Sequence, residues 1–242
     1  MAYTGDVTHG GGPAVRELAG LTVKKVSVGP MDNNAYVLTC RSDGSQLLID
    51  AANDAETLLE LIGPAGLATV VTTHRHPDHT GALKEIVKAT GARSVASADD
   101  AAAIPLVTDT VSDGDTIAVG DCTLEVIHLV GHTPGSIVLL YREPGGIAHL
   151  WTGDSLFPGG PGGTRNPKDF ASLMGDLETK IFGSAARRHL VLSGPRQGQH
   201  HRRRAAGHPR MARTRLVTGR CLTARAVRHR RRSRSGCPAR PR

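Results

Sequence analysis

The chain has 242 residues, 30 of them basic and 22 acidic, with a formal net charge of +8 and a sequence pI of about 9.8. It contains no charged-then-apolar leader and no apolar span of roughly 20 residues, which indicates neither export nor insertion into a membrane. We therefore expect a cytoplasmic protein with one domain large enough to bury a real core.

The charge is divided unevenly along the chain. Residues 1–184 contain 12 basic and 22 acidic side chains, whereas residues 185–242 contain 18 Arg and no Asp, Glu or Lys. The net charge of +8 therefore describes neither part. We expect a loose lead over residues 1–18, one domain over residues 19–184, and an Arg-rich tail over residues 185–242. The tail is too polar and too charged to offset the entropy of ordering it, so it is expected to be disordered.

Alternating and apolar runs predict the strands, and apolar residues at helical spacing predict the helices. Asp54 and Thr80 are the expected N-caps of the first two helices. A glycine-rich stretch at residues 157–168 is predicted to be a mobile loop that borders the substrate or lies plainly on the surface. In chain order the pattern predicts strands at 21–28, 35–39, 67–73, 94–97, 116–119, 122–129, 137–141 and 148–152, and helices at 54–62, 80–91, 99–104 and 169–182.

A cluster of potential metal ligands follows the predicted strand at residues 67–73. His74, His76, Asp78 and His79 place three imidazoles and a carboxylate within six positions. Neutral imidazole and carboxylate are ligands for zinc, iron or manganese, and strand ends are where α/β sheets present their sites. His74 and His76 are two positions apart and can share one ion. Asp78 and His79 are adjacent and suit a second ion; the alternative is a surface loop that happens to be His-rich.

Two further candidate ligands lie downstream, each just after a predicted strand. His132 stands in a Gly-His-Thr-Pro-Gly-Ser turn, a good place for a third ligand to the ion of the first two histidines. Asp154 stands in Gly-Asp-Ser-Leu-Phe, and its two carboxylate oxygens can bridge two cations. His128 and His149 fall inside predicted strands and are interpreted as packing or surface histidines.

The order of these three motifs resembles the metallo-β-lactamase superfamily, and within it most closely the glyoxalase II-like hydrolases, over residues 21–184. Residues 46–50 are similar to the family's early strand that ends in Asp. The resemblance implies an α/β fold, the αββα sandwich, with the metals at one edge of two packed sheets. It implies Zn²⁺ as one or two ions, with Fe or Mn possible. His74, His76 and His132 would hold the first ion, Asp78 and His79 the second, with Asp154 bridging.

The implied activity is a metal-dependent hydrolase in which a metal-bound hydroxide attacks a thioester or a related small acyl substrate. Asp78 and Asp154 would be the catalytic residues that orient the hydroxide or take its proton. One alternative is a mononuclear-iron thiol or persulfide dioxygenase that uses His74, His132 and Asp154. Another is a catalytically impaired fragment, or a nucleic-acid binder that works through the basic tail, if that tail is genuine.

The family has one more ligand for the second ion, a His in a Pro-Gly-His-Gly turn near the end, and this sequence contains no such turn. Residues 193–197 (Ser-Gly-Pro-Arg-Gln) are compatible with codons that, read one nucleotide later, encode Pro-Gly-His-Gly-Lys. The same shift, with compatible codons, allows Leu-Pro-Asp-Asp-Thr at residues 185–189. We interpret the tail as translated out of frame; a real basic arm and a separate small domain are the alternatives. The second ion would then be weakly held.

Overall fold

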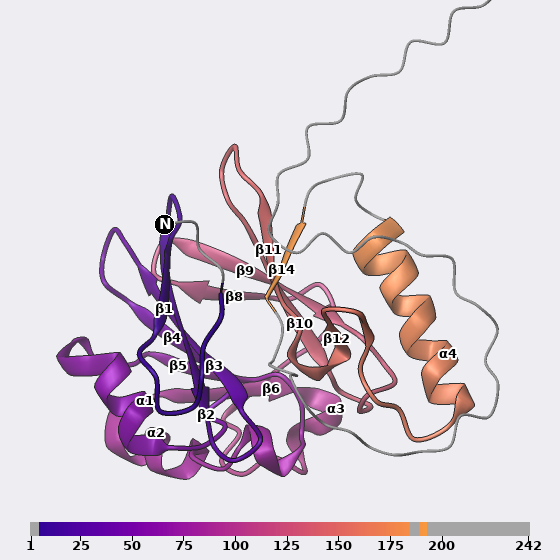
Figure 1. Cartoon of the computed structure of the whole chain (residues 1–242), viewed down its shortest axis with the longest axis horizontal. Coiled ribbons are helices and arrows are strands. Elements are labelled where there is room, and N and C mark those ends of the chain that lie inside the picture. The colour runs from indigo at the N-terminus through magenta and orange to yellow at the C-terminus, as the bar shows by residue number, and fades with distance from the viewer. Residues whose placement is uncertain (1–4, 184–188, 193–242) are drawn as a thin grey trace, which may run out of the picture.

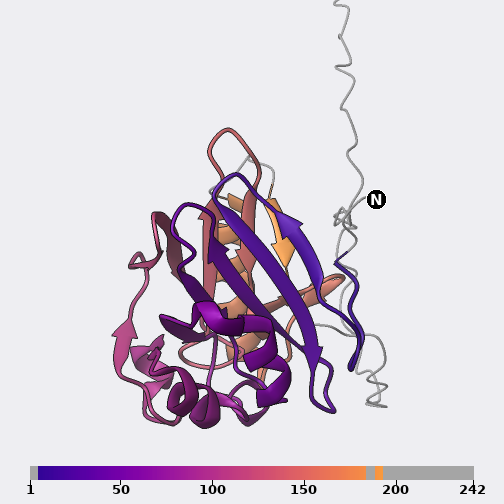
Figure 2. The same cartoon turned by 90° about the vertical axis from the view of Figure 1, so that its left-hand side faces the viewer.

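The structure is a computed structural model that describes residues 5–183 and 189–192. The interpretations made for residues 185–188 and 193–242 lie outside the described part of the chain. Two β-sheets pack face to face, and helices lie on both outer faces of the pair (Figure 1). Figure 2 shows the same arrangement after a quarter turn. The predicted αββα sandwich is confirmed.

The first sheet contains seven strands in chain order. Its first four strands pair antiparallel, and β4 to β7 pair parallel. The parallel part therefore presents the ends of several consecutive strands at one edge. The strands are β1 (Ala14–Glu17), β2 (Leu21–Val28), β3 (Asn33–Cys40), β4 (Gln46–Ile49), β5 (Thr69–Thr72), β6 (Arg93–Ser97) and β7 (Asp109–Val111).

The second sheet contains five strands in the order β14-β11-β10-β9-β8. The pairs from β8 to β11 are antiparallel, and β14 lies parallel to β11. The prediction of a disordered tail from residue 185 is therefore wrong at His189–Leu192, where backbone pairing with β11 forms a strand. A separate two-stranded hairpin follows β11. The strands are β8 (Thr116–Val119), β9 (Cys122–His128), β10 (Ile137–Arg142), β11 (Ala148–Trp151) and β14 (His189–Leu192), with β12 (Leu156–Phe157) and β13 (Gly160–Pro161) in the hairpin.

Short helices connect the strands of the first sheet, and one longer helix lies between the hairpin β12–β13 and strand β14 of the second sheet. No helix in the described residues is long and apolar enough to cross a bilayer. Asn166 caps α4 by accepting a hydrogen bond from the backbone N–H of Asp169. The helices are α1 (Ala55–Ile62), α2 (Leu83–Thr90), α3 (Ala98–Ala101) and α4 (Pro167–Asp176), the 3-10 turns η1 (Gly63–Ala65), η2 (Pro77–His79) and η3 (Gly153–Ser155), and the π-helical turn η4 (Leu177–Gly183).

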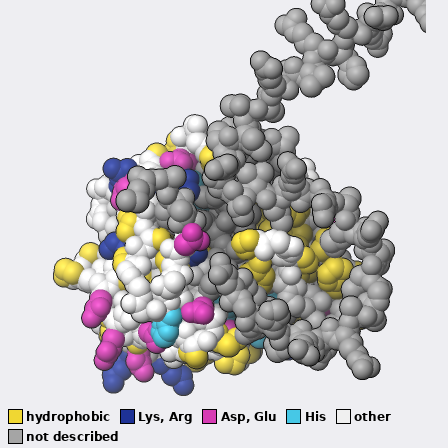
Figure 3. All heavy atoms as spheres, viewed as in Figure 1, with side chains coloured by type: hydrophobic (Ala, Val, Ile, Leu, Met, Phe, Trp, Pro, Cys, Tyr) yellow, Lys and Arg dark blue, Asp and Glu magenta, His cyan; other side chains and the backbone are white. Residues whose placement is uncertain are grey.

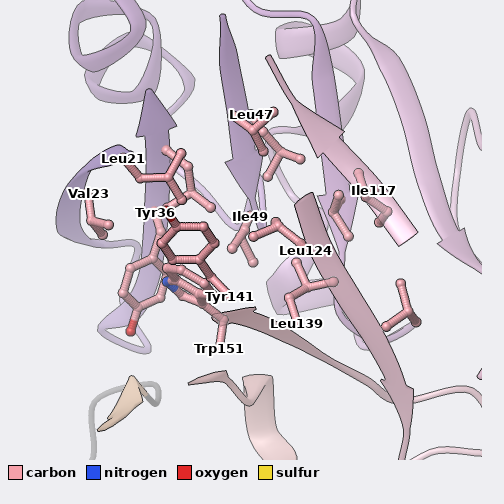
Figure 4. Packing of buried hydrophobic residues seen from close by; sticks show 14 of the residues in the cluster. Leu21, Val23, Tyr36, Leu47, Ile49, Ile117, Leu124, Leu139, Tyr141 and Trp151 are labelled. Atoms are coloured by element: carbon pink, nitrogen blue, oxygen red, sulfur yellow. The ribbon is translucent and has the colours of Figure 1, made fainter. Parts of the chain in front are cut away.

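Three hydrophobic clusters account for the layers. One lies between the two sheets, where Tyr36, Tyr141 and Trp151 gather at one side (Figure 4). A second packs α1 and α2 on the first sheet, and a third packs α4 and η4 on the second sheet. Each fully buried large apolar side chain contributes about 1.5–3 kcal/mol relative to leaving it exposed. The alternating apolar residues of the strands thus hold the four layers together.

The lead over residues 1–18 is partly structured, which corrects the prediction. Ala14–Glu17 form the edge strand β1, which pairs with β2 from Ala14 opposite Lys25 to Glu17 opposite Thr22. Its side chains alternate between half-buried and exposed, so little apolar surface marks this segment in the sequence. Backbone pairing with β2, rather than side-chain burial, explains the strand.

Neither predicted helix cap is made by its side chain. Asp54 precedes α1, but its carboxylate accepts a hydrogen bond from the backbone N–H of Gly29 instead. The second helix starts at Leu83, because residues 77–79 form a separate 3-10 turn first. Thr80 closes that turn by donating its hydroxyl to the carbonyl of Pro77 at 3.2 Å. The ligand motif is therefore followed by a tight turn, and only then by a helix.

The two sheets are joined at the edge where the ligand motifs lie. The backbone N–H of Ile137, at the start of β10, donates to the carbonyl of Thr73, just after β5, at 2.9 Å. Asp154 follows β11 in the turn η3. Segments from both sheets thus meet at one end of the sandwich.

Candidate metal centre

Three of the predicted ligands converge in the first cluster, which consists of His74, His76 and His132. One nitrogen of each ring lies within 4.8 Å of one nitrogen of each of the others. His74 and His132 are buried, whereas His76 is half-buried. The sequence predicted that these three histidines share one ion, and the structure brings them together as that prediction requires.

A second cluster consists of His74, His79 and Asp154, again with ligand atoms within 4.8 Å of one another. The carboxylate of Asp154 lies between the two clusters. Its Oδ1 is 3.4 Å from Nε2 of His79, and its Oδ2 is 3.8 Å from Nε2 of His132. One carboxylate therefore faces both clusters, which is the arrangement that a ligand bridging two ions would need.

Asp78 lies at the margin of the second cluster and is not a member of it. Its Oδ2 is 3.9 Å from Nε2 of His79. The side-chain amide of Asn33 donates to this same Oδ2 at 3.0 Å and to the carbonyl of Asp78 at 2.8 Å. Asn33 was not among the predicted site residues, although it belongs to the turn between the first two predicted strands. It fixes the position of Asp78 beside the other ligands.

Asp50 orients two of the histidine rings. It accepts a hydrogen bond from Nδ1 of His79 at 2.9 Å and another from the hydroxyl of Thr73 at 2.8 Å. Because the Thr73 hydroxyl gives its hydrogen to Asp50, its oxygen accepts from Nδ1 of His74, 3.1 Å away. An imidazole that donates through Nδ1 keeps a lone pair on Nε2 when neutral. The buried carboxylate thus turns Nε2 of both rings toward the site.

A glycine-rich hairpin orients the third ring. Nδ1 of His132 donates to the carbonyl of Gly163 at 2.7 Å, so Nε2 of His132 also carries its lone pair into the site. The predicted mobile loop over residues 157–168 thus contains most of the short hairpin β12–β13 and contacts the site directly. The backbone N–H of Gly162 donates to the carbonyl of Ser155 at 3.1 Å, which holds the hairpin on the turn that carries Asp154.

Replacing Gly162 with alanine is expected to destabilise the metal-free protein by about 1–3 kcal/mol, the usual range for overpacking. A Cβ at Gly162 would overlap the carbonyl oxygen of Asp154, so the hairpin must move. Gly160→Ala is the matched control in the same hairpin, since a Cβ there meets nothing within 4 Å. Urea unfolding with a chelator present measures both changes. Equal stability of the two variants would show that the backbone at Gly162 is not in close contact with the turn that carries Asp154.

The histidine nitrogens are arranged as a cation site requires. Nε2 of His74 lies 3.3 Å from Nε2 of His132, and hydrogen bonds at both Nδ1 atoms leave a lone pair on each of these nitrogens. Nε2 of His79 is buried and has no hydrogen-bond partner among the residues that the structure describes. Facing lone pairs repel each other unless a cation lies between them. Nitrogen and carboxylate ligands in this number fit a divalent transition metal ion.

The protonation of the rings agrees with this arrangement. Burial holds the pKa of His74 well below its usual range, and the neighbouring histidines lower it further, so this ring is neutral. Burial also lowers the pKa of His79, but the carboxylates of Asp50 and Asp154 outweigh burial and raise it to about 10. A cation that takes Nε2 of His79 must therefore displace a proton.

The two histidines interpreted as packing or surface residues lie outside both clusters. Nε2 of His128 donates to the carbonyl of Pro134 at 2.7 Å. His149 is fully buried, and its Nε2 lies 3.2 Å from a carboxylate oxygen of Glu143. Neither ring faces the site.

Two packed sheets between helical layers, with histidines and an aspartate converging at one edge, define an α/β sandwich with a candidate metal centre. The family model described as "Metallo-beta-lactamase superfamily" matches residues 28–189, and the chain belongs to this superfamily. The match includes all six predicted ligands.

Individual proteins show the same relationship. The chain is 37% identical over 133 residues to a hydroxyacylglutathione hydrolase of Rhodospirillum rubrum, which covers 54% of this chain and 50% of that protein. It spans about half the length of the hydroxyacylglutathione hydrolases that it matches. A solved structure, TTHA1623 in a di-iron-bound form, is 26% identical with a TM-score of 0.58 and covers 72% of this chain and 93% of that one. ETHE1 from Myxococcus xanthus shares the fold at 24% identity, with a TM-score of 0.63 and coverage of 73% and 77%.

Proposed function

We propose that this chain is a zinc-dependent hydrolase of thioesters or related acyl compounds, similar in action to glyoxalase II. The observation that carries the proposal is the position of Asp154, whose two oxygens face His79 and His132; this supports two cation positions side by side. The relatives named hydroxyacylglutathione hydrolase support a thioester as the substrate class.

Metal ions bound here would supply Lewis acidity, lowering the pKa of a water molecule and polarising the acyl carbonyl. The side chains supply the rest. Asp154 and Asp78 carry the carboxylate oxygens that can take the proton of the attacking water, and Asn33 holds Oδ2 of Asp78 in place. A thiol has a pKa of about 8.5, so a thiolate leaves with little need for protonation. This site therefore suits a thioester better than an ester, whose alkoxide leaving group needs an acid.

Thioester hydrolysis by the zinc-loaded chain is the direct test. We expect thiol release from a hydroxyacylglutathione to exceed release of alcohol from an oxygen ester of the same acyl group. A chelator should abolish the activity, and added zinc should restore it. Comparing the hydrolysis rates of two thioesters that share the acyl group but differ in the thiol measures how strongly the enzyme recognises the thiol. Thiol release no faster than in a reaction without protein would refute the proposal.

The dioxygenase alternative would need one iron held by His74, His132 and Asp154. The positions of these side chains permit such a triad, with 3.3 Å between the two histidine nitrogens and 3.8 Å between His132 and Asp154. The convergence of His76 on the same point favours the hydrolase, because it adds a third imidazole to the first ion. Oxygen uptake with a thiol or persulfide substrate, at one iron per chain, would support the dioxygenase instead.

Nucleic-acid binding through the tail rests on residues outside the described part of the chain. The described surface offers it little support, since basic and acidic side chains are interspersed on the face shown in Figure 3. Phosphate binding by proteins relies on clustered Lys and Arg. Loss of salt-dependent DNA binding on deleting residues 185–242 would be the sign of a genuine basic arm.

A further inference from the structure

We propose that Asp100 is a positioning residue that ties together the two loops carrying the first cluster. The inference rests on the proposed metal-binding role of His74, His76 and His132. Asp100 lies in the short helix α3, and its side chain has no exposed surface. A buried carboxylate is unfavourable unless hydrogen bonds and a cation compensate for the lost water. Asp100 receives both, and all of these partners belong to the two ligand loops.

The first loop is held through Arg75, the residue between His74 and His76. The backbone N–H of Arg75 donates to Oδ2 of Asp100 at 3.0 Å. Nε of the same residue lies 3.6 Å from Oδ1 and supplies the compensating positive charge. Because Arg75 joins the two ligands in sequence, this contact fixes the backbone from which both imidazoles project.

The second loop is held through Thr133 and Gly135, just after the ligand His132. The hydroxyl of Thr133 donates to Oδ2 of Asp100 at 2.6 Å, and the backbone N–H of Gly135 donates to Oδ1 at 3.0 Å. A Cβ at Gly135 would lie 2.8 Å from the side chain of Asp100, so this close approach requires glycine. Two residues of the Thr-Pro-Gly sequence, Thr133 and Gly135, thus donate hydrogen bonds to Asp100.

Only a carboxylate satisfies both loops at once. Each oxygen of Asp100 accepts one backbone N–H, from Gly135 at Oδ1 and from Arg75 at Oδ2. An amide at this position has one oxygen and one NH₂ group, so either orientation sets N–H against N–H and releases one loop. The first loop follows β5 of one sheet and the second follows β9 of the other. Asp100 therefore sets the spacing of ligands that come from opposite sheets.

The test is the zinc affinity of Asp100→Asn in the full chain, measured by competition with a chromophoric chelator. Outer hydrogen-bond partners of metal ligands typically contribute 10–100-fold to affinity, and we expect zinc binding to weaken by this factor. His132→Ala gives the baseline for zinc held elsewhere on the chain. Asp99→Asn is the matched control, because it makes the same change on the neighbouring residue. The side chain of Asp99 is 62% exposed, and its carboxylate lies 3.7 Å from His128. The zinc affinity of the Asp99→Asn protein should therefore stay within about twofold of that of the unaltered chain.

A second pair of variants keeps the test valid if Asp100→Asn does not fold. Thr133→Val removes the hydroxyl donor while keeping the shape of the side chain, and we expect zinc binding to weaken about tenfold. Thr133→Ser keeps the hydroxyl and should restore the affinity. Urea unfolding without metal separates a change in stability from a change in zinc affinity.

Each outcome decides the proposal. Zinc affinity that drops in the folded Asp100→Asn or Thr133→Val proteins, but not in Asp99→Asn or Thr133→Ser, supports the positioning role. Lower stability with unchanged zinc affinity would overturn it and leave Asp100 a purely structural residue. If the unaltered chain binds no more zinc than His132→Ala, the metal-binding function itself fails, and the positioning role fails with it.

Discussion

Replacing His76 with alanine is expected to lower the zinc bound at saturation by one ion per chain. His76 is the half-buried member of the first cluster, and its ring forms no hydrogen bond with other described residues. The substitution therefore removes a ligand and little packing. Loss of several kcal/mol of Lewis-acid stabilisation should also reduce thioester hydrolysis by roughly 10²–10³-fold. Elemental analysis of the purified protein gives the stoichiometry, and thiol release gives the rate.

His9→Ala is the control for this measurement. His9 is a half-exposed histidine that bonds to Asp54 at 2.9 Å, outside both clusters. Replacing His9 with alanine should change neither the zinc content of the protein nor the rate of thioester hydrolysis. Histidines of the tail remain in both proteins, so zinc bound there cancels in the comparison. An unchanged zinc content in His76→Ala would remove the basis for assigning the first cluster as a metal site.

The convergence of the candidate ligands could be predicted from the sequence, because three of them follow one strand closely. His74, His76 and His79 follow one strand within six positions, so the end of β5 brings them together whatever the rest of the fold does. His132 and Asp154 could be added because each follows another strand, and strand ends of packed sheets meet at one edge. The assignment of each candidate ligand to the first or the second ion came from the family resemblance, because spacing alone does not determine it.

The residues that orient the ligands could not be predicted in the same way. Asp100 contacts Arg75 and Thr133, which are 25 and 33 positions away, only because β6 lies beside β5 and the second sheet packs on the first. Asn33 meets Asp78 across 45 positions. The pair Asp99-Asp100 looks like an ordinary solvated helix start, and nothing in the sequence marks one carboxylate as buried.

Missed elements have a similar cause. The edge strands β1 and β7 are short and only half-buried, so they carry little of the apolar alternation that predicts a strand. The helix predicted over residues 169–182 is α4 followed by the π-helical turn η4. Apolar residues at helical spacing predict a continuous helix, and they do not reveal this change in hydrogen bonding. Leu173, Leu177 and Ile181 lie inward as their spacing predicts, whereas Phe170, at the same spacing, is 40% exposed and does not join the core.

The second ion is expected to bind this chain much more weakly than the first. Among the described residues its candidate ligands are His79 and Asp154, with His74 shared with the first cluster and Asp78 at the margin. The resemblance implies one further histidine, in a Pro-Gly-His-Gly turn that the sequence lacks. Strand β14 pairs parallel with β11, with Leu192 opposite Trp151, so β14 ends at the edge that carries Asp154. A ligand supplied directly after β14 would therefore start from the edge where the two clusters lie, and the resemblance implies that it would serve the second ion.

Codons compatible with residues 185–197, read one nucleotide later, encode that turn, and a chain with the shifted sequence can be compared directly with this one. We expect the shifted chain to bind the second zinc ion more than about 100-fold more tightly, since even outer partners of metal ligands contribute 10–100-fold. Zinc titration should then show two tight ions per chain in place of one. Sequencing the coding DNA around codons 183–186 establishes whether the shift lies in the gene or in its translation.

A further variant separates the restored ligand from the loss of the basic tail. Alanine in place of the histidine of the restored turn keeps the shifted sequence but removes the ligand, and it should return the titration to one tight ion. If that variant still binds two ions tightly, the gain came from removing the Arg-rich tail, whose charge repels cations. If the unshifted chain already binds two ions tightly, then His79, Asp154 and Asp78 suffice for the second ion. That ion must still displace the proton of His79, whose pKa the carboxylates of Asp50 and Asp154 raise. Its affinity would then rise with pH, because each ion bound displaces a proton from that ring.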